Sequence, residues 1–241
     1  MGDFLQSIRR LLVIGDIHGQ IHQFNELLDK IEFDETKDLL FLIGDYVDRG
    51  ENPKAVIAKV RELERKGAIV LKGNHESMME KALSGKEPTA VSHWAANGGA
   101  QTLQSYGLDI RTVYRQICDG QLTLPDDLLN DLDWIAHLNI YAQTQHYIFV
   151  HAGVDPDRNL EDTDEETLLW IRDPFFNGYH GEKTVIFGHT PTMNFQPSCD
   201  VFFGKNNIIG IDGGCVFGGQ LNCLELPSQA AYSVKTNSSP D

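Results

Sequence analysis

The chain has 241 residues, of which 41% are hydrophobic, and its formal net charge is -15 at pH 7. This length and composition are typical of a globular protein with a substantial apolar core, and they exclude a disordered or fibrous chain. The negative charge argues against a nucleic-acid partner, because such proteins need a basic surface to displace counterions from phosphates. It does not exclude a phosphorylated ligand, because metal ions and a few arginines can reverse the electrostatic field inside one cleft.

The cysteines and the N-terminus indicate the compartment. Four cysteines occur, at 118, 199, 215 and 223. They include no C-x-x-C pair, so we expect reduced thiols rather than a disulfide scaffold. No apolar run is long enough to span a membrane, and the first residues lack the pattern of a signal peptide. We therefore expect a cytoplasmic protein without a membrane partner. The sequence leaves the oligomeric state open, and a monomer is consistent with it.

Short apolar runs predict strands that are buried on both faces. They cover residues 11–14, 39–43, 69–71, 147–150, 185–187 and 208–211. Between the first runs, residues 21–31 and 53–63 place apolar side chains at helical spacing, and Pro53 stands near the start of the second helix. The alternation of strand and helix predicts an α/β fold with largely parallel pairing in the first third of the chain.

The rest of the chain predicts a different organisation. Residues from about 77 to 141 are expected to be mainly helical and to form a cap beside the sheet. The last third is expected to form strands joined by tight glycine turns, with Leu221–Leu226 as the final strand. We expect a frayed tail at residues 236–241. No internal repeat or linker is visible, so a single domain of residues 1–241 is the simplest division.

Polar residues follow nearly every predicted strand. In a wound α/β sheet, ligands bind outside the carboxyl ends of the strands. Here those ends present carboxylates, an amide and imidazoles: Asp16, His18, Asp45, Asn74, His75, His151 and His189. A single histidine after a strand is more often structural than a metal ligand. The full set in this order predicts a metal site, with ligand types that suit Mn²⁺, Fe or Zn²⁺.

Three of these segments form compact sequence boxes. They are Gly-Asp-Ile-His-Gly at 15–19, Gly-Asp-Tyr-Val-Asp-Arg-Gly at 44–50 and Gly-Asn-His-Glu at 73–76. In the first box, Asp16 and His18 stand two residues apart, so both can point to the same side of an extended strand end. The second box adds Asp48 and Arg49 on the loop after Asp45.

The three boxes resemble the signature of the PPP-type metallophosphoesterases, and residues 151–153 and 188–190 look like later ligand boxes of that family. The resemblance covers residues 11 to about 226. Segments 93–99 and 170–173 are similar to the branch of bacterial serine/threonine protein phosphatases that includes bacteriophage lambda phosphatase. Gly213 departs from the pattern, because relatives usually have Thr there. The resemblance implies a β-sandwich of mixed sheets flanked by helices, with a helical cap.

The resemblance also implies the roles of the site residues. It assigns Asp16 and His18 to a first metal ion, Asp45 to both ions, and Asn74, His151 and His189 to the second. It makes His75 an acid oriented by Asp48, and it gives Arg49 and Arg172 the task of gripping phosphoryl oxygens.

These residues predict hydrolysis by a bridging metal hydroxide. Two divalent cations about 3.5–4 Å apart lower the pKa of a shared water towards neutrality. Mn²⁺ is the expected ion, with Fe or Zn²⁺ as alternatives. The leaving alkoxide needs a proton, which His75 can supply, and we expect Asp48 to raise the pKa of His75. The planar guanidinium groups of Arg49 and Arg172 match phosphate oxygens.

Three functions remain open. The leading hypothesis is a serine/threonine protein phosphatase, with broader phosphoesterase activity on small phosphoesters as an extension of it. The second is a dinucleoside polyphosphate hydrolase of the diadenosine tetraphosphatase type. Those relatives typically lack the Asp at position 48 and have Asp where Glu76 stands, so Asp48 and Glu76 favour the phosphatase. The third is a non-catalytic metal-binding module. His22, His93, His137, His146 and His180 are interpreted as surface or structural residues.

Overall fold

The computed structural model describes residues 10–236, and its strands form two five-stranded sheets. The first sheet has the order β10-β9-β1-β2-β3. Strands β1, β2 and β3 are parallel, whereas β9 and β10 are antiparallel to their neighbours. The bounds are β1 Arg10–Ile14, β2 Asp38–Leu42, β3 Ile69–Val70, β9 Gln220–Leu226 and β10 Ala231–Lys235. The parallel pairing predicted for the first third is therefore confirmed.

The prediction that Leu221–Leu226 is the last strand is wrong. Strand β10 follows it and pairs with β9 at the edge of the sheet. Within β10 only Val234 is buried, so this edge strand lacks the continuous apolar run that identifies strands covered on both faces. Of the tail predicted to fray, only Thr236 belongs to the described residues.

The second sheet has the order β4-β5-β6-β8-β7. Its three central strands are parallel, and the two outer strands are antiparallel to them. The bounds are β4 Tyr141–Gln143, β5 Tyr147–Val150, β6 Thr184–Phe187, β7 Phe202–Phe203 and β8 Ile208–Gly210. Two mixed sheets with helices around them confirm the predicted α/β fold class.

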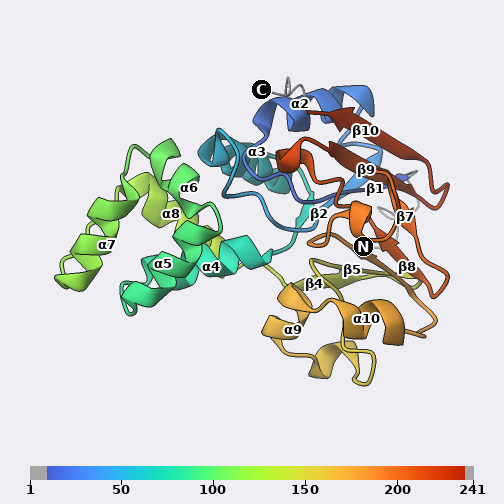
Figure 1. Cartoon of the computed structure of the whole chain (residues 1–241). Helices are drawn as coiled ribbons and strands as arrows, with labels where there is room; N and C mark the ends of the chain where they lie inside the picture. The colour runs from blue at the N-terminus through green and yellow to red at the C-terminus, as the bar shows by residue number, and fades with distance from the viewer. Residues whose placement is uncertain (1–9, 237–241) are drawn as a thin grey trace.

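The two sheets pack face to face around an apolar core. Phe41 of β2 stacks on Phe149 of β5 with ring centroids 3.8 Å apart, and Val13, Ile186 and Ile209 belong to the same cluster. Helices α2 (Ile21–Lys30) and α3 (Pro53–Arg65) pack on the first sheet, and α9 (Glu165–Trp170) and α10 (Asp173–Gly178) lie beside the second (Figure 1). The result is a sandwich with helices on its outer faces.

Helix α3 shows how the sequence sets these elements. The side chain of Asn52 accepts a hydrogen bond from the N–H of Ala55, and Pro53 occupies the first helical position. Both features favour a helix start at this point. Val56, Val60 and Leu63 then recur at helical spacing and are all buried, so this face of the helix covers the sheet.

Five helices lie between β3 and β4 and share a separate apolar cluster that includes Met79, Trp94 and Leu103. We call α4 to α8 the helical cap, which projects to the left in Figure 1. Its bounds are α4 Asn74–Leu83, α5 Pro88–Ala96, α6 Gly99–Ser105, α7 Ile110–Cys118 and α8 Asp126–Ala136. Because α4 begins directly at Asn74, the cap is joined to a predicted metal ligand.

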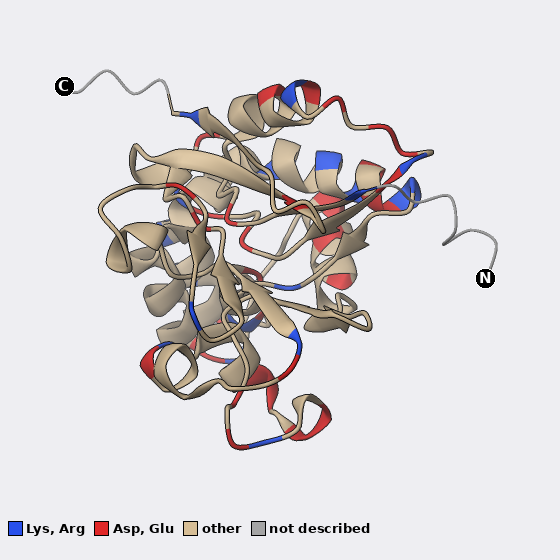
Figure 2. Cartoon of the chain, turned by 90° about the vertical axis from the view of Figure 1, so that its right-hand side faces the viewer, with Lys and Arg blue, Asp and Glu red and all other residues tan. Residues whose placement is uncertain are grey.

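The surface carries charges of both signs. Figure 2 shows Asp and Glu on several helices and loops, with Lys and Arg interspersed among them. The net charge of -15 is thus spread over many elements. Within residues 10–236, no helix has the length and apolar composition that crossing a bilayer requires.

Candidate metal centre

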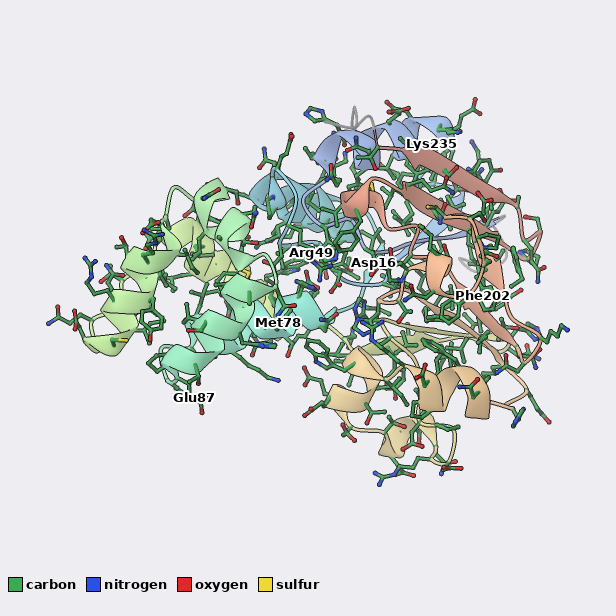
Figure 3. The ribbon with its side chains drawn as sticks, viewed as in Figure 1. Asp16, Arg49, Met78, Glu87, Phe202 and Lys235 are labelled. Atoms are coloured by element: carbon green, nitrogen blue, oxygen red, sulfur yellow. The ribbon has the colours of Figure 1, made fainter. Side chains whose placement is uncertain are left out.

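The predicted ligands lie where strands of both sheets end. Asp16 and His18 follow β1, and Asp45 follows β2. His151 and His189 come from the second sheet, directly after β5 and just after β6. Figure 3 places Asp16 and Arg49 between the helical cap and the sheets. The site therefore depends on the packing of one sheet against the other.

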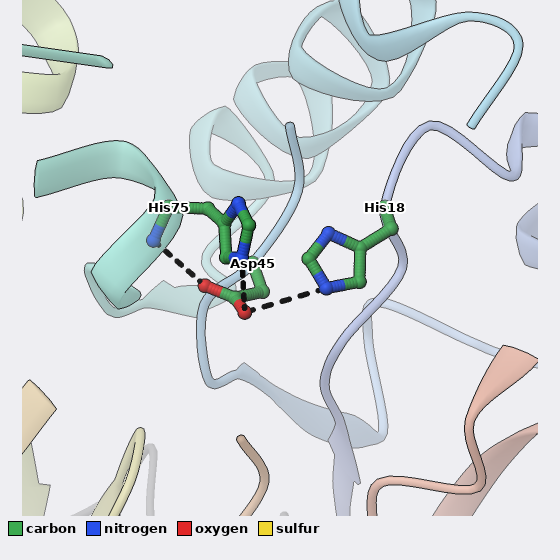
Figure 4. A group of neighbouring side chains, drawn as sticks. All are labelled: His18, Asp45 and His75. Atoms are coloured by element: carbon green, nitrogen blue, oxygen red, sulfur yellow. Dashed lines mark hydrogen bonds and ion pairs between the residues drawn. The ribbon is translucent and has the colours of Figure 1, made fainter. Parts of the chain in front are cut away.

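Two groups of buried side chains have the spacing of a metal site, with ligand atoms within 4.8 Å of one another in each. The first contains His18, Asp45 and His75, and the second contains Asp45, His151 and His189. In the first, Asp45 Oδ2 lies 3.4 Å from His18 Nε2 and 4.0 Å from His75 Nε2 (Figure 4). In the second, Asp45 Oδ1 lies 3.3 Å from His151 Nε2. Asp45 belongs to both groups, as a bridging carboxylate would.

Backbone carbonyls fix the orientation of two imidazoles. Nδ1 of His18 lies 2.8 Å from the carbonyl oxygen of Val47, and Nδ1 of His151 lies 3.0 Å from that of Ile43. Since a carbonyl only accepts, both Nδ1 atoms donate, and the Nε2 lone pairs face Asp45. Metal-bound histidines in proteins are commonly oriented by such a hydrogen bond from the other ring nitrogen.

Buried polar atoms without a partner mark the centre of the site. Among the described residues, Asp16 Oδ2 and His189 Nε2 are fully buried and make no hydrogen bond. The Oδ1 of Asn74 lies 2.7 Å from His151 Nε2 and 2.9 Å from His189 Nδ1. Burying a polar atom without a partner is costly. The donor set of carboxylate, amide oxygen and imidazole therefore fits divalent cations, which would satisfy these atoms.

The placement of Asp16 differs from that of Asp45. Asp16 belongs to neither of the two groups. Its Oδ1 accepts a hydrogen bond of 2.7 Å from the backbone N–H of His189, so it spans from the first sheet to the second. His75, for which an acid role is expected, lies in the first group, beside Asp45.

The backbone around the site is held in unusual conformations. Nine non-glycine residues of the described chain have positive φ, and six of them are site residues: Asp16, His18, Asp45, Asp48, Arg49 and His189. Such strain persists only where the surrounding structure enforces it, and it concentrates at functional sites. The site also leaves no room for a side chain at position 188, since a Cβ on Gly188 would lie 1.9 Å from Asp16 Oδ2.

Burial raises the pKa values of the carboxylates, which a cation would oppose, and lowers those of the imidazoles, which a cation would reinforce. Burial, together with the charges of Asp212 and Asp45, raises the pKa of Asp16, and burial also raises that of Asp45. Burial lowers the pKa of His151 to about 4 and that of His189 to about 2, so both imidazoles are neutral at pH 7. Neutral imidazole is the form that binds metals.

His75 and Asp48 form a buried pair. Nδ1 of His75 lies 2.6 Å from Oδ2 of Asp48, and an ionised Asp48 accepts the Nδ1–H in this hydrogen bond. Burial outweighs the charges of the neighbouring carboxylates and lowers the pKa of His75 to about 4, so any increase from Asp48 does not set the overall direction. Burial also raises the pKa of Asp48 to about 7, against the hydrogen bonds from Thr102 and Trp94.

The two arginines contact residues of the site. Nη1 of Arg49 lies 2.7 Å from His18 Nε2, and its guanidinium lies over the ring of Phe217 with 5.1 Å between Cζ and the centroid. Nη1 of Arg172, which is exposed, donates to Thr190 Oγ1 at 2.5 Å. The histidines interpreted as surface or structural residues, namely His22, His93, His137, His146 and His180, are all exposed.

Asp212 is a site residue for which the sequence pattern predicted no role. It follows β8 and is 6% exposed, and its charge contributes to raising the pKa of Asp16. The signal that identified the other residues was present, since the apolar run 208–211 ends at this aspartate. The contribution of the cap to Asp48 had no comparable sequence signal.

Comparisons with known proteins agree with this geometry. A family model described as calcineurin-like phosphoesterase matches residues 9–220. Serine/threonine-protein phosphatase 1 of Salmonella typhimurium is 29% identical, covering 90% of this chain and 92% of its own. An asymmetrical bis(5'-nucleosyl)-tetraphosphatase of Oceanobacillus iheyensis is 25% identical, and the similarity covers 92% of this chain and 90% of that protein. The solved structure of a putative diadenosine tetraphosphatase superposes with a TM-score of 0.68 at 22% identity, covering 95% of both chains.

Proposed function

We propose that this chain, which belongs to the calcineurin-like phosphoesterase family, is a metal-dependent serine/threonine protein phosphatase. The observation that carries the proposal is the buried His75–Asp48 pair beside Asp45. A serine or threonine alkoxide is a poor leaving group and needs a proton as its bond to phosphorus breaks. A positioned acid typically contributes about 10²–10⁴-fold to such a step.

The proposed metal ligands are Asp16, His18, Asp45, Asn74, His151 and His189. When bound, two divalent cations would activate a water molecule and offset the negative charge of the phosphoryl group. Mn²⁺ is the proposed ion, and Fe or Zn²⁺ suit the same donor set. The unpartnered Asp16 Oδ2 and His189 Nε2 support this assignment, because a cation would satisfy both atoms.

The residues around the ligands have separate tasks in this proposal. Asp48 holds the Nδ1–H of His75, which directs Nε2 towards the reacting centre. In its protonated form, with Nδ1–H still donating to Asp48, His75 would give its Nε2 proton to the leaving oxygen as the phosphorus–oxygen bond breaks and would return to the neutral imidazole. Arg49 and Arg172 bind the phosphoryl oxygens through their planar donor groups.

Dinucleoside polyphosphate hydrolysis is the competing function. The relative from Oceanobacillus iheyensis supports it, because the similarity extends over 92% of this chain. In that reaction the leaving group is a nucleotide phosphate, which is far less basic than an alkoxide and needs little protonation. The His75–Asp48 pair therefore favours the phosphatase.

The test is reconstitution of the metal-stripped protein with Mn²⁺, Fe²⁺ or Zn²⁺, followed by comparison of kcat/KM for a phosphoserine peptide and for diadenosine tetraphosphate. We expect the phosphopeptide to be preferred. A preference for the dinucleotide of about a hundredfold or more would reverse the assignment. A protein that binds the metal but hydrolyses no phosphoester would be a non-catalytic metal-binding module.

The acid role of His75 is tested with His75→Asn and with His180→Asn as the matched control on the surface. We expect His75→Asn to lower kcat by about 10²-fold or more on the phosphoserine peptide, and much less on an aryl phosphate with a good leaving group. His180→Asn should retain full activity on both. Unchanged kcat in His75→Asn would remove the acid from the proposal.

A further inference from the structure

We infer that Trp94 and Thr102, which both belong to the helical cap, are positioning residues that act on the reaction through Asp48. The inference rests on the proposed function, because it concerns the same acid pair. It means that the cap completes the reaction centre and does not merely border it.

The contacts of Asp48 divide between the acid and the cap. Trp94 Nε1 donates to both carboxylate oxygens, at 2.9 Å each. Thr102 Oγ1 donates to Oδ1 at 2.6 Å, while Oδ2 receives the Nδ1–H of His75 at 2.6 Å. Thr102 Oγ1 in turn accepts the backbone N–H of Asp48 at 2.9 Å. These bonds fix the plane of the carboxylate, and this plane sets the direction of the imidazole.

Burial leaves no substitute for these donors. Asp48, Trp94 and Thr102 are each 0% exposed. Water therefore cannot take the place of a lost indole N–H or hydroxyl without local opening, and the carboxylate would be left with an unfilled acceptor site. The indole itself is held in place, because a Cβ on Gly99 would lie 2.4 Å from its ring.

The same part of the cap also holds Arg49. The carbonyl oxygen of Gly98 accepts the backbone N–H of Arg49 at 3.1 Å, and a Cβ on Gly98 would lie 2.6 Å from Arg49 Cγ. Asp48 and Arg49 have φ values of 70° and 67°, in the left-handed region. The junction of α5 and α6 thus supports a strained turn that carries both the partner of the acid and a phosphate-binding arginine.

An apolar contact would be enough if Trp94 only filled space. Instead, its single polar atom points at the one carboxylate that orients His75. This predicts that removal of the N–H slows proton delivery, in addition to the stability lost because the smaller phenyl ring leaves a cavity. Trp94→Phe and Thr102→Val make these changes, and Thr102→Ser retains the hydroxyl as the conservative variant.

Trp134→Phe is the matched control for Trp94→Phe. The Nε1 of Trp134 also donates to a carboxylate, that of Glu64 at 2.7 Å, but away from the site. Both variants lose an indole–carboxylate hydrogen bond. A purely structural role for Trp94 therefore predicts a lower melting temperature in both proteins, without selective loss of activity on substrates with poor leaving groups.

The first measurement is kcat and KM on a phosphoserine peptide and on 2,4-dinitrophenyl phosphate. We expect Trp94→Phe and Thr102→Val each to lower kcat on the peptide by about 10–100-fold, with little change in KM and less than about threefold loss on the aryl ester. Thr102→Ser should recover most of the activity. In a His75→Asn background, Trp94→Phe should cause no further loss, because both act on the same proton.

Equal losses on both substrates, or additive losses in the double variant, would overturn the inference while the proposed function remained. Failure of the wild-type protein on every monoester would instead reject the proposed function. In that case NMR of the His75 Nδ1 proton still tests the geometry. We expect a slowly exchanging resonance in the wild type and fast exchange in Trp94→Phe, whereas identical exchange in both proteins would contradict it.

Discussion

The carboxylate of Glu76 accepts the backbone N–H of Asp45 at 2.8 Å. Its two oxygens also accept the backbone N–H groups of Tyr46, Val47 and Gly73, and the side chain is 0% exposed. One carboxylate at the start of α4 therefore holds the turn that presents the central ligand. The position of Asp45 therefore depends on the start of the helical cap as well as on the sheet.

Glu76→Gln tests this arrangement. The amide has one oxygen where the carboxylate has two, and its NH₂ group would face backbone donors. We expect metal affinity to fall by about 10–100-fold and the free energy of unfolding to fall by about 1–3 kcal/mol for each N–H left unsatisfied. Titration calorimetry with Mn²⁺ and thermal unfolding of the metal-free protein measure the two effects.

Glu80→Gln is the control for this substitution. Glu80 lies one turn further along α4 and pairs with Lys72 at 3.0 Å, at a partly exposed position. Glutamine at position 80 can still accept a hydrogen bond from Lys72, which also lies 3.7 Å from Glu165, so we expect the metal affinity to be unchanged. If both variants bound Mn²⁺ as tightly as the wild type, the role assigned to Glu76 would be incorrect.

Gly188→Ala should disable the metal centre. The added Cβ would lie 1.9 Å from Asp16 Oδ2, and Asp16 accepts the N–H of His189. Either the carboxylate or the turn between β6 and His189 must move, so both sheets lose a proposed ligand position. We expect loss of Mn²⁺ binding by more than about tenfold, measured on the same calorimetric scale.

Gly67→Ala separates this local clash from general strain. Gly67 has a φ of 103°, and a Cβ there would meet nothing within 4 Å. The variant should be less stable by about 1 kcal/mol because of its backbone conformation, but it should bind metal normally. Equal losses of binding in the two glycine variants would indicate that the effect of Gly188→Ala is not local.

Arg172→Lys should weaken the binding of inorganic phosphate as a competitive inhibitor. Arg172 donates to Thr190 Oγ1, which fixes one side of its guanidinium and leaves the other donors for a ligand. Lysine keeps the charge but loses the planar fork, so we expect the inhibition constant to rise by about tenfold. Arg158→Lys, which changes an exposed arginine near Asp155, is the control. An unchanged inhibition constant would exclude Arg172 from phosphate binding.

The buried thiols predict a pH effect on stability. Burial raises the pKa of Cys215 to about 11 and that of Cys223 to about 12, from 9.0. Above pH 9 the unfolded chain loses these protons while the folded chain retains them. The contribution to stability is therefore present below pH 9 and is lost as the pH rises towards the folded values. Between pH 9 and the folded pKa of a thiol, its titration lowers the free energy of unfolding by about 1.4 kcal/mol per pH unit.

Denaturation of Cys223→Ala beside the wild type isolates this contribution from other groups. The difference in unfolding free energy between the two proteins should narrow as the pH increases from about 8 to about 10. A constant difference would contradict the raised pKa. Alkylation of the native protein at neutral pH gives an independent comparison, because the exposed Cys118 should react before the buried Cys215 and Cys223.

Much of the site follows from the sequence because its residues stand directly after buried strands. The apolar runs before Asp16 and Asp45 were continuous, since β1 and β2 are covered on both faces. Strand β10 could not be recognised in this way, because it lies at an edge and is only partly buried. Continuous burial, rather than strand length, decides which strands the pattern reveals.

The environment of Asp48 could not be predicted. Trp94 and Thr102 lie 46 and 54 residues away in the chain, on two helices of the cap. Helical periodicity indicates that such residues face a core, but it does not identify the group they contact. The pKa of His75 could not be predicted for the same reason, because it depends on how completely other elements exclude water.

The left-handed residues of the metal centre limit how this protein can evolve greater thermal robustness. At Asp16, Asp45 or His189 a glycine would relax the backbone, but it would also delete a proposed ligand. Proteins are commonly stabilised by substitutions that match each residue to its backbone conformation, but such substitutions would remove proposed ligands at these positions. Selection for a higher melting temperature must therefore act on the sheets, the helices and the distant turns, while the backbone of the metal centre keeps its unfavourable conformations.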